Sequence, residues 1–341
     1  RWNVEDEGEI ADLLNVEITR EGDHVVLRQR GYIDKMVSTY LASPPSKLVK
    51  VPCTERLPNI VLDAQLLKSE GKEVDPDLLA QYQSVVGALL YCSTHSRPDI
   101  AFAVGQLCRA MSCPTPELLA AALRVVEYLH CTRDLGLHYC REERGSLRGF
   151  SDSDWAVRHS TSGFVFKFNS AAISWGSKKQ KSIALSSCES EIVAASEAAK
   201  EAVYLSNFLR ELKLIGSKII KLFVDNTSAR DLAYNPEHHE RTKHIDRRHF
   251  FVRELVEREV IEVPYVNTAE NLADFFTKPL APNTFIGLRD AIMNIPHTSS
   301  PHAIHCAPPK PAVLVAGGAS SGACMHAHAH ESAPSGCHWE C

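Results

Sequence analysis

Gly149-Phe-Ser-Asp-Ser-Asp-Trp155 places two carboxylates on a strand-like, otherwise apolar segment. A carboxylate in such surroundings is costly unless a positive group binds it. Asp152 and Asp154 therefore indicate a site rather than a plain core strand. Three further acids lie at the start of a long helix, after a β-branched run and within an apolar helix: Glu191, Asp225 and Asp274. Carboxylates at the ends of core elements favour a site for divalent cations.

Composition narrows the classes of protein to consider. The 341 residues are enough for two domains with their own cores. A net charge of −5 gives no global basic character, so nucleic-acid binding would have to come from local patches. No apolar run approaches the roughly 18 residues of a membrane span, and Arg1-Trp2-Asn3 does not resemble a signal peptide. Scattered cysteines are typical of reduced thiols. We expect an intracellular, non-secreted piece of a longer protein.

The first 140 residues predict a β-hairpin followed by helices. Alternating runs flank Gly22-Asp23, a hairpin turn signal, and apolar spacing predicts a helix over 31–40. A proline-broken connector then leads to a small helical bundle. The helices of this bundle are predicted to begin at Asp75-Pro76, Ile100 and Glu117. Arg97-Pro98-Asp99 is interpreted as a helix N-terminus, where the acid suits the helix dipole.

From residue 135 the pattern changes to strands and crossover helices. A short strand over 135–139 precedes three runs that predict an antiparallel meander: 147–155, 163–168 and 172–175. The clearest helix is predicted over 187–214, where apolar residues recur at steps of three and four. A strand over 219–224 and a short helix follow, then a basic segment over 238–253. The series ends with a strand over 260–266 and a helix over 270–277. This order predicts an α/β domain with a mixed sheet of about five strands.

The predicted positions of the acids favour one shared metal site. Asp152 lies in the first strand of this domain, Asp225 at the carboxyl end of a strand expected to be parallel, and Glu191 in the first turn of the crossover helix. Sites in open α/β sheets form at that edge. Two-metal phosphodiester hydrolysis needs hard oxygen ligands around two ions, and Mg²⁺ prefers carboxylates. The alternative is a set of unrelated acids that cap or flank helices. Spacing alone leaves both open.

A series of short motifs carries a resemblance to a known family. In chain order these motifs are Gly149–Trp155, Ser160–Gly163, Ile173–Trp175, Ser177–Gln180, Ala184–Ser187, Glu189–Glu191, Val224–Asn226, His239–Asp246 and Leu272–Pro279. Together they resemble the ribonuclease H domain of copia-type LTR retrotransposon Pol polyproteins. Upstream, Tyr82–Gly87 and Arg97–Val104 resemble the family's connection between reverse transcriptase and ribonuclease H, and Leu27–Ile33 resembles the end of the polymerase part. The resemblance covers roughly residues 10–290.

The resemblance implies an α/β ribonuclease H-like fold and an endoribonuclease that cleaves the RNA strand of RNA–DNA hybrids by two-metal-ion hydrolysis. Matched by position, its catalytic and metal-binding acids are Asp152, Glu191, Asp225 and Asp274. The implied cofactor is a pair of Mg²⁺ ions, with Mn²⁺ as a substitute. Asp154 and Glu189 are ranked as supporting or surface acids. Many relatives carry a histidine shortly before the last aspartate, whereas Asn267-Thr-Ala-Glu270 has none; whether a histidine from 238–249 assists stays open.

Local basic patches are the candidates for contact with nucleic acid. The predicted contact residues are Lys178, Lys179, Lys181, Asn226, Arg241, Lys243, His244, Arg247 and Arg248. For the second patch the alternative is a solvated helix face balanced by Glu240 and Asp246. His239 and His244 do not form a zinc-protease pair, since five residues rotate a helix by about 500° and separate the two side chains.

The chain is accordingly divided into a reverse transcriptase remnant (1–58), a helical connection (59–140), a ribonuclease H-like domain (141–293) and a disordered tail (294–341). The implied partners are an RNA–DNA hybrid and the upstream reverse transcriptase part, in a cytoplasmic virus-like particle or the nucleus, with no membrane. The alternative function is a degenerate, inactive retroelement fragment that only binds nucleic acid. Polymerase activity is not expected, because no Tyr-x-Asp-Asp motif occurs. The His- and Cys-rich tail lacks the spacing of a folded zinc module.

Overall fold

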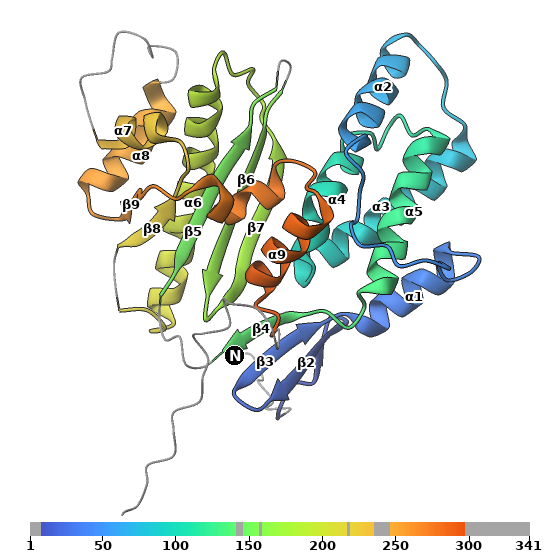
Figure 1. Cartoon of the computed structure of the whole chain (residues 1–341), viewed down its shortest axis with the longest axis horizontal. Helices are drawn as coiled ribbons and strands as arrows, with labels where there is room; N and C mark the ends of the chain where they lie inside the picture. The colour runs from blue at the N-terminus through green and yellow to red at the C-terminus, as the bar shows by residue number, and fades with distance from the viewer. Residues whose placement is uncertain (1–7, 141–145, 157–158, 217–218, 235–245, 297–341) are drawn as a thin grey trace, which may run out of the picture. The chain divides into compact units, whose positions relative to one another are not determined.

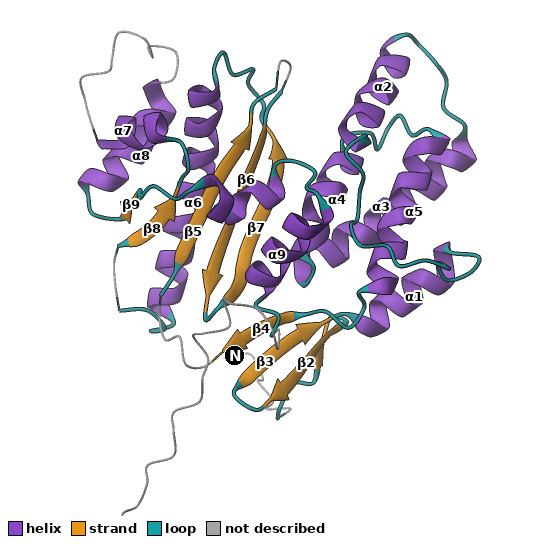
Figure 2. Cartoon of the chain, in the orientation of Figure 1, coloured by secondary structure: helices purple, strands orange, loops and turns teal. Residues whose placement is uncertain are grey.

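A five-stranded mixed sheet forms the centre of the second half of the chain. The computed structural model describes residues 8–140, 146–156, 159–216, 219–234 and 246–296. Strands β5 (Arg148–Asp154), β6 (Thr161–Phe168) and β7 (Ala171–Lys179) form the predicted antiparallel meander. Strands β8 (Ile220–Phe223) and β9 (Ile261–Glu262) extend it in parallel, giving the order β7-β6-β5-β8-β9 (Figures 1 and 2). The predicted α/β class with a mixed sheet of five strands is confirmed.

The long helix α6 (Ser187–Glu211) packs against this sheet. Its buried stripe is rich in alanine, including Ala195, Ala199 and Ala202, and these short side chains let the helix approach the strands closely. Two shorter helices, α7 (Thr227–Tyr234) and α8 (Asp246–Glu257), contact α6 beyond β8. Helix α8 occupies the end of the basic segment predicted over 238–253.

A second sheet joins the two ends of the helical region. Strands β1 (Asp12–Leu13), β2 (Val16–Glu21) and β3 (His24–Arg28) contain the predicted hairpin. The predicted strand over 135–139 is present as β4 (Leu137–Cys140), but it pairs antiparallel with β3 (Figure 2). Leu137 lies opposite Leu27 in this register. The sheet thus covers an edge of the hairpin with a strand that follows more than 100 residues later.

The helices between these strands are α1 (Arg30–Tyr40), α2 (Leu57–Ser69), α3 (Pro76–His95), η1 (Pro98–Ile100), α4 (Ala101–Cys108) and α5 (Pro116–Cys131). The bundle was predicted, but α2 was missed. Pro58 lies in the first turn of α2, where proline starts a helix and does not break one. Asp99 does open a helical turn as expected, yet its carboxylate forms a fully buried ion pair with Arg97, 2.6 Å apart.

The helix predicted over 270–277 is present, but in 3₁₀ geometry and in two pieces. The segment consists of two 3₁₀ turns, η3 (Thr268–Glu270) and η4 (Leu272–Phe276), and the last α-helix is α9 (Pro282–Met293). The side chain of Asn271 accepts a hydrogen bond from the N–H of Ala273 (3.1 Å), which starts a new turn instead of continuing the first. The predicted strand over 260–266 is also shorter, continuing past β9 only as a bridge between Val224 and Tyr265.

The helical region and the five-stranded sheet share one hydrophobic core. Leu107 and Tyr128 from the helices belong to the same buried cluster as Val165 and Phe276 from the second half. The domain boundaries at 58, 140 and 293 stay predictions, and the predicted disorder of the tail falls almost wholly outside the described residues. Within the described part of the chain, no helix has the length and apolar character needed to cross a membrane.

Candidate metal centre

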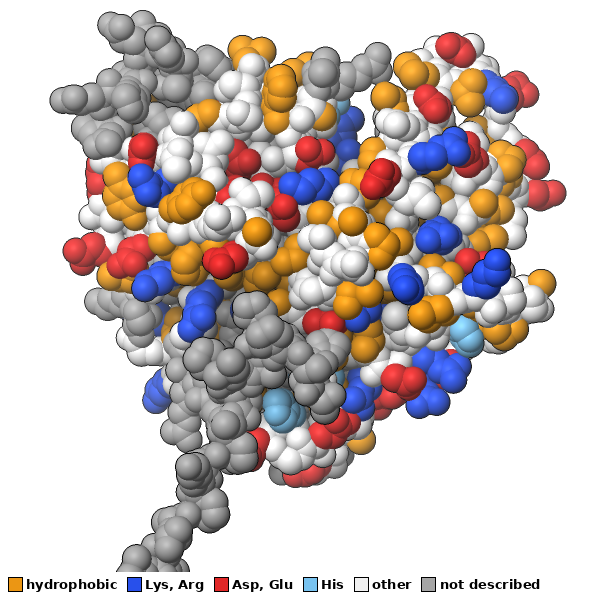
Figure 3. All heavy atoms as spheres, viewed as in Figure 1, with side chains coloured by type: hydrophobic (Ala, Val, Ile, Leu, Met, Phe, Trp, Pro, Cys, Tyr) orange, Lys and Arg blue, Asp and Glu red, His pale blue; other side chains and the backbone are white. Residues whose placement is uncertain are grey.

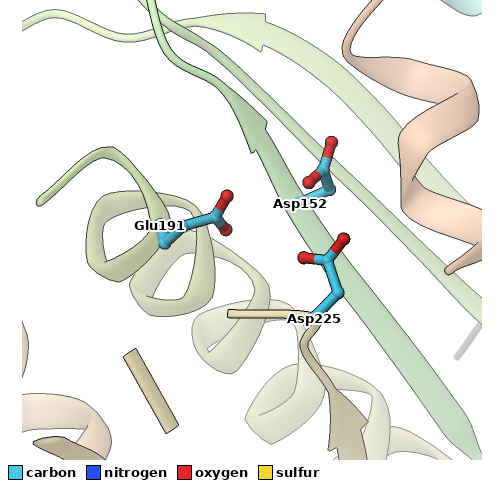
Figure 4. Close-up of side chains that lie close together, drawn as sticks. All are labelled: Asp152, Glu191 and Asp225. Carbon is cyan, nitrogen blue, oxygen red and sulfur yellow. The ribbon is translucent and has the colours of Figure 1, made fainter. Parts of the chain in front are cut away.

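Three carboxylates meet at the edge of the sheet where β5 and β8 end. Asp152 projects from β5, Asp225 follows β8, and Glu191 comes from the first turns of α6. Each offers an oxygen within 4.8 Å of the others, and Figure 4 shows the three side chains turned toward one another. The parallel pairing of β5 with β8 explains this meeting, since it brings the carboxyl ends of both strands to one edge.

The start of α6 gives Glu189 and Glu191 different roles. Ser186 caps the helix by accepting from the N–H of Glu189 (3.1 Å), and Glu189 Oε2 accepts from the N–H of Leu185 (2.6 Å). This reciprocal capping arrangement holds Glu189 at the helix terminus. Glu191 lies two residues on, about 200° around the helix, and joins the acid cluster instead.

Of the pair Asp225-Asn226, which could have served only to cap the next helix, Asn226 is the residue that caps it. Asn226 Oδ1 accepts from the N–H of Ala229 (3.0 Å) and so caps α7. The Asp225 carboxylate lies in the acid cluster with Asp152 and Glu191. Asn226 was a predicted nucleic-acid contact; its side-chain oxygen is occupied by this cap.

Burial and mutual repulsion raise the pKa values of two of the acids. Burial raises the pKa of Asp152 to about 7; a hydrogen bond from the Thr277 hydroxyl opposes the shift, while Asp274 and Asp225 add to it. Burial, followed by repulsion from Asp152 and Asp225, raises the pKa of Glu191 to about 9. The Oε2 atom of Glu191 is buried without a hydrogen-bond partner. Hard oxygens, crowded negative charge and an unpartnered carboxylate oxygen together fit a divalent cation.

Asp274 does not join the group of three. It lies in η4 beside Asp152, and its carboxylate binds Lys278 Nζ at 2.8 Å. Gly163 permits this placement, because a Cβ there would lie 2.7 Å from Thr277 Cγ2 and 2.9 Å from the carbonyl oxygen of Ala273. Sequence reasoning named neither Thr277 nor Lys278 as site residues. Two features of the sequence could have indicated them: both lie in the Leu272–Pro279 motif, and Lys278 follows Asp274 at the four-residue spacing of a helical ion pair.

The predicted basic contacts are spread over several surfaces. Lys178 and Lys179 point to opposite faces of β7, since neighbouring residues alternate along a strand. Lys181 is exposed in the loop before α6. Arg248 on α8 donates to Ser182 Oγ (3.0 Å) and so ties α8 to that same loop. Arg241, Lys243 and His244, together with the side chain of Arg247, lie outside the described residues.

No protein-family model matches the chain. It is 34% identical over 290 residues to "Retrovirus-related Pol polyprotein from transposon TNT 1-94" of Nicotiana tabacum, covering 83% of the chain and 21% of the relative. It is 33% identical to the corresponding protein from transposon RE1 of Arabidopsis thaliana, covering 84% and 19%. A shorter match is 46% identical over 136 residues to "Secreted RxLR effector protein 161" of Plasmopara viticola, covering 39% and 96%. The chain spans about a fifth of the Pol polyproteins it matches.

Among solved structures, an RNase H1 from Halobacterium salinarum aligns at 16% identity and a TM-score of 0.30, covering 39% of this chain and 95% of that one. The foamy viral protease-reverse transcriptase in complex with RNA/DNA hybrid aligns at 15% identity and a TM-score of 0.40, covering 75% and 29%. The fold itself is defined by the strand order β7-β6-β5-β8-β9, with β8 parallel to both β5 and β9.

Proposed function

The chain belongs to the copia-type retrotransposon Pol polyproteins, and we propose that its second half is a ribonuclease H that hydrolyses the RNA strand of RNA–DNA hybrids. The observation that carries this proposal is the cluster of Asp152, Glu191 and Asp225 at the edge of the mixed sheet. Such a cluster suits phosphodiester hydrolysis, which requires several hard oxygen ligands on rigid elements.

Each acid has a part in the proposed reaction. Asp152, Glu191 and Asp225 would hold two divalent ions, Mg²⁺ or Mn²⁺, with Asp274 completing the site. Bound there, the ions would supply polarisation of the scissile phosphate and a lowered pKa for the attacking water. The water oxygen would form the new bond to phosphorus as the bond to the 3′ oxygen breaks, with the water giving up a proton to solvent and the departing 3′ oxygen taking one up. The products are a 3′-hydroxyl and a 5′-phosphate.

Neighbouring residues would keep these acids in place. The Thr277 hydroxyl fixes the orientation of Asp152 through its hydrogen bond to Oδ2. Lys278 balances the charge of Asp274. Lys178, Lys179, Lys181, Asn226 and Arg248, with the basic residues over 241–247, would contact the hybrid. The partners proposed are the hybrid and the upstream reverse transcriptase part of the polyprotein, inside the cell in a cytoplasmic particle or the nucleus. Recovery of the mature protein from the medium would contradict that location.

A hybrid-cleavage assay with a metal titration tests the function. The purified chain is expected to degrade labelled RNA annealed to DNA, only when Mg²⁺ or Mn²⁺ is added, and to leave duplex DNA intact. Asp152→Asn removes one ligand and is expected to lower the rate by at least about a hundredfold, the scale on which loss of a metal ligand or its support acts. An active Asp152→Asn protein would refute the mechanism. Salt-dependent hybrid binding without turnover in either metal would favour the inactive, binding-only alternative.

A further inference from the structure

A cationic side chain from the helical region reaches the catalytic edge of the sheet. Arg109 follows α4 directly, and its Nη2 donates to Thr161 Oγ1 at 3.0 Å. Thr161 begins β6 and pairs with Asp154 of β5 on one side and Lys179 of β7 on the other. One turn earlier, a Cβ on Gly105 would lie 3.1 Å from the carbonyl oxygen of Ser177, so α4 is packed closely against β7.

Thr161, the residue that Arg109 contacts, lies close to the acid cluster. Thr161 lies two residues along β6 from Gly163, the partner of Asp152. With strands about 4.8 Å apart and a rise of about 3.3 Å per residue, the Cα atoms of Asp152 and Thr161 are roughly 8 Å apart. That distance corresponds to about two to three nucleotide rises of 3.4 Å along one strand. On the face in Figure 3, basic side chains lie beside acidic ones where the sheet meets the helices.

Arg109 has spare donors and no close acid. A guanidinium carries five N–H donors, and toward the described residues the side chain of Arg109 uses one of them, on the neutral Thr161 hydroxyl. Among the described residues, no carboxylate lies within 4.0 Å of it. Burial lowers the pKa of Arg109 to about 10, with Asp154 opposing the shift. Burial and then the charge of Arg109 lower the pKa of Lys179. Two cations held together in this way favour an anion between them.

We propose that Arg109, Thr161 and Lys179 form a phosphate-binding site for the backbone of one strand of the hybrid. The inference deepens the proposed function and rests on it. Arginine binds phosphate through paired N–H donors, and Lys179 adds a second charge. Thr161 is buried, and by accepting from Arg109 its hydroxyl holds the guanidinium in place for the phosphate. The helical region would thus contribute directly to substrate positioning by the nuclease.

Asp154 is the acid that distinguishes this role from a structural one. Its side chain is exposed, and its charge acts on both Arg109 and Lys278. If Arg109 served mainly to balance Asp154, the variants Arg109→Gln and Asp154→Asn would have similar effects. If Arg109 binds phosphate, Asp154→Asn removes a repulsive charge from beside the ligand. The two variants are then expected to change hybrid affinity in opposite directions.

The first experiment measures binding of the full chain to a labelled RNA–DNA hybrid by fluorescence anisotropy in EDTA, so that no cleavage occurs. Arg109→Gln is expected to weaken binding roughly tenfold, as for loss of one charged hydrogen bond. It should also reduce the slope of log affinity against log salt by about 0.9, one phosphate contact. Arg56→Gln is the matched control, since Arg56 is 78% exposed at the start of α2. Equal affinities for wild type and Arg109→Gln would overturn the inference.

A second experiment locates the contact. Hybrids carrying one neutral methylphosphonate at successive positions are bound to the wild type and to Arg109→Gln. The wild type should lose affinity at one position beside the scissile phosphate, and the variant should be insensitive there alone. Thermal unfolding is measured in parallel, and a variant that is unfolded is replaced by Arg109→Lys, expected to retain part of the affinity. Inorganic phosphate at millimolar concentration should not compete if the ligand is the nucleic-acid backbone; full competition would contradict that.

The two proposals fail in different ways. If the wild type cleaves hybrid but Arg109→Gln binds and cleaves as well as the wild type, the phosphate site is wrong and the nuclease stands. If the wild type neither cleaves nor binds hybrid, the proposed function fails first. If both variants weaken binding equally, Arg109 acts as the partner of Asp154 and the phosphate site is excluded.

Discussion

At the level of single residues, the acids of the cluster oppose folding unless something neutralises them. A carboxyl group whose pKa is raised in the folded state favours folding when it is protonated. That stability is fully present below the unfolded pKa and is lost as the pH rises through the folded pKa. For Glu191 the window runs from its ordinary value of 4.5 to about 9. The metal-free protein therefore loses stability across neutral pH because of this residue.

Glu191→Gln is expected to remove that loss. Without metal, the variant should unfold at a higher temperature than the wild type at pH 8, and the difference should shrink toward pH 5. The slope of the difference is at most about 1.4 kcal/mol per pH unit for one group. Thermal unfolding across this range checks it, with Glu197→Gln, an exposed residue of the same helix, as the control. With saturating Mg²⁺ or Mn²⁺ the order should reverse; a pH-independent difference would argue against a raised pKa.

The Thr277 hydroxyl is expected to tune the site through Asp152. Thr277→Val removes the hydrogen bond to the carboxylate while keeping the shape of the side chain. Loss of such a supporting contact weakens metal binding or activity by about 10- to 100-fold. A metal titration of cleavage measures this, with Thr94→Val as the control, because among the described residues the partners of that hydroxyl all lie in α3, at Leu90, Tyr91 and His95. An unchanged metal dependence would show that the hydrogen bond is dispensable.

At the level of elements, the approach of η4 to β6 depends on Gly163. An added Cβ would meet Thr277, the Ala273 carbonyl and Phe276 at 2.7–2.9 Å. Gly163→Ala is expected to destabilise the protein by about 1–3 kcal/mol through overpacking. It should also reduce cleavage, because η4 carries Asp274. Gly87→Ala in α3 has open space around it and is expected to be neutral or stabilising by up to about 1 kcal/mol. Denaturant unfolding measures the stability of both variants. Equal stabilities of Gly163→Ala and Gly87→Ala would contradict the close approach of η4 to β6.

Regular elements with strong periodicity were predictable, and those set by tertiary contacts were not. The meander and α6 follow from alternation and from the three- and four-residue spacing of apolar residues. The two 3₁₀ turns at 268–276 depend on asparagine side chains competing for backbone N–H groups. Asp152, Glu191 and Asp225 were placed together correctly because strand direction fixes one edge. The contacts of Thr277 with Asp152 and of Lys278 with Asp274 could not be predicted, because they depend on how η4 packs against β6.

At the level of the whole chain, a buried ion pair holds the helical region together. Arg97 binds Asp99 and also donates to the carbonyl of Thr132, while the Tyr128 hydroxyl donates to Asp99. Both charged side chains are fully buried. Arg97→Met is expected to cost about 3–5 kcal/mol, because it leaves an unpaired carboxylate in the core. Arg56→Met at the exposed pair with Glu117 should cost less than about 1 kcal/mol. Similar values for the two variants would refute the buried pair.

The pairing of β4 with β3 also constrains the order of events during synthesis. His24 of β3 pairs with Cys140 of β4, so an edge of the hairpin stays open until more than 100 further residues have been made. An open strand edge invites pairing with other chains. Contacts so distant in sequence form slowly, because a long loop must close first. A chain truncated before residue 137 therefore keeps an unprotected strand edge, and truncated products are expected to become more soluble once β4 is included.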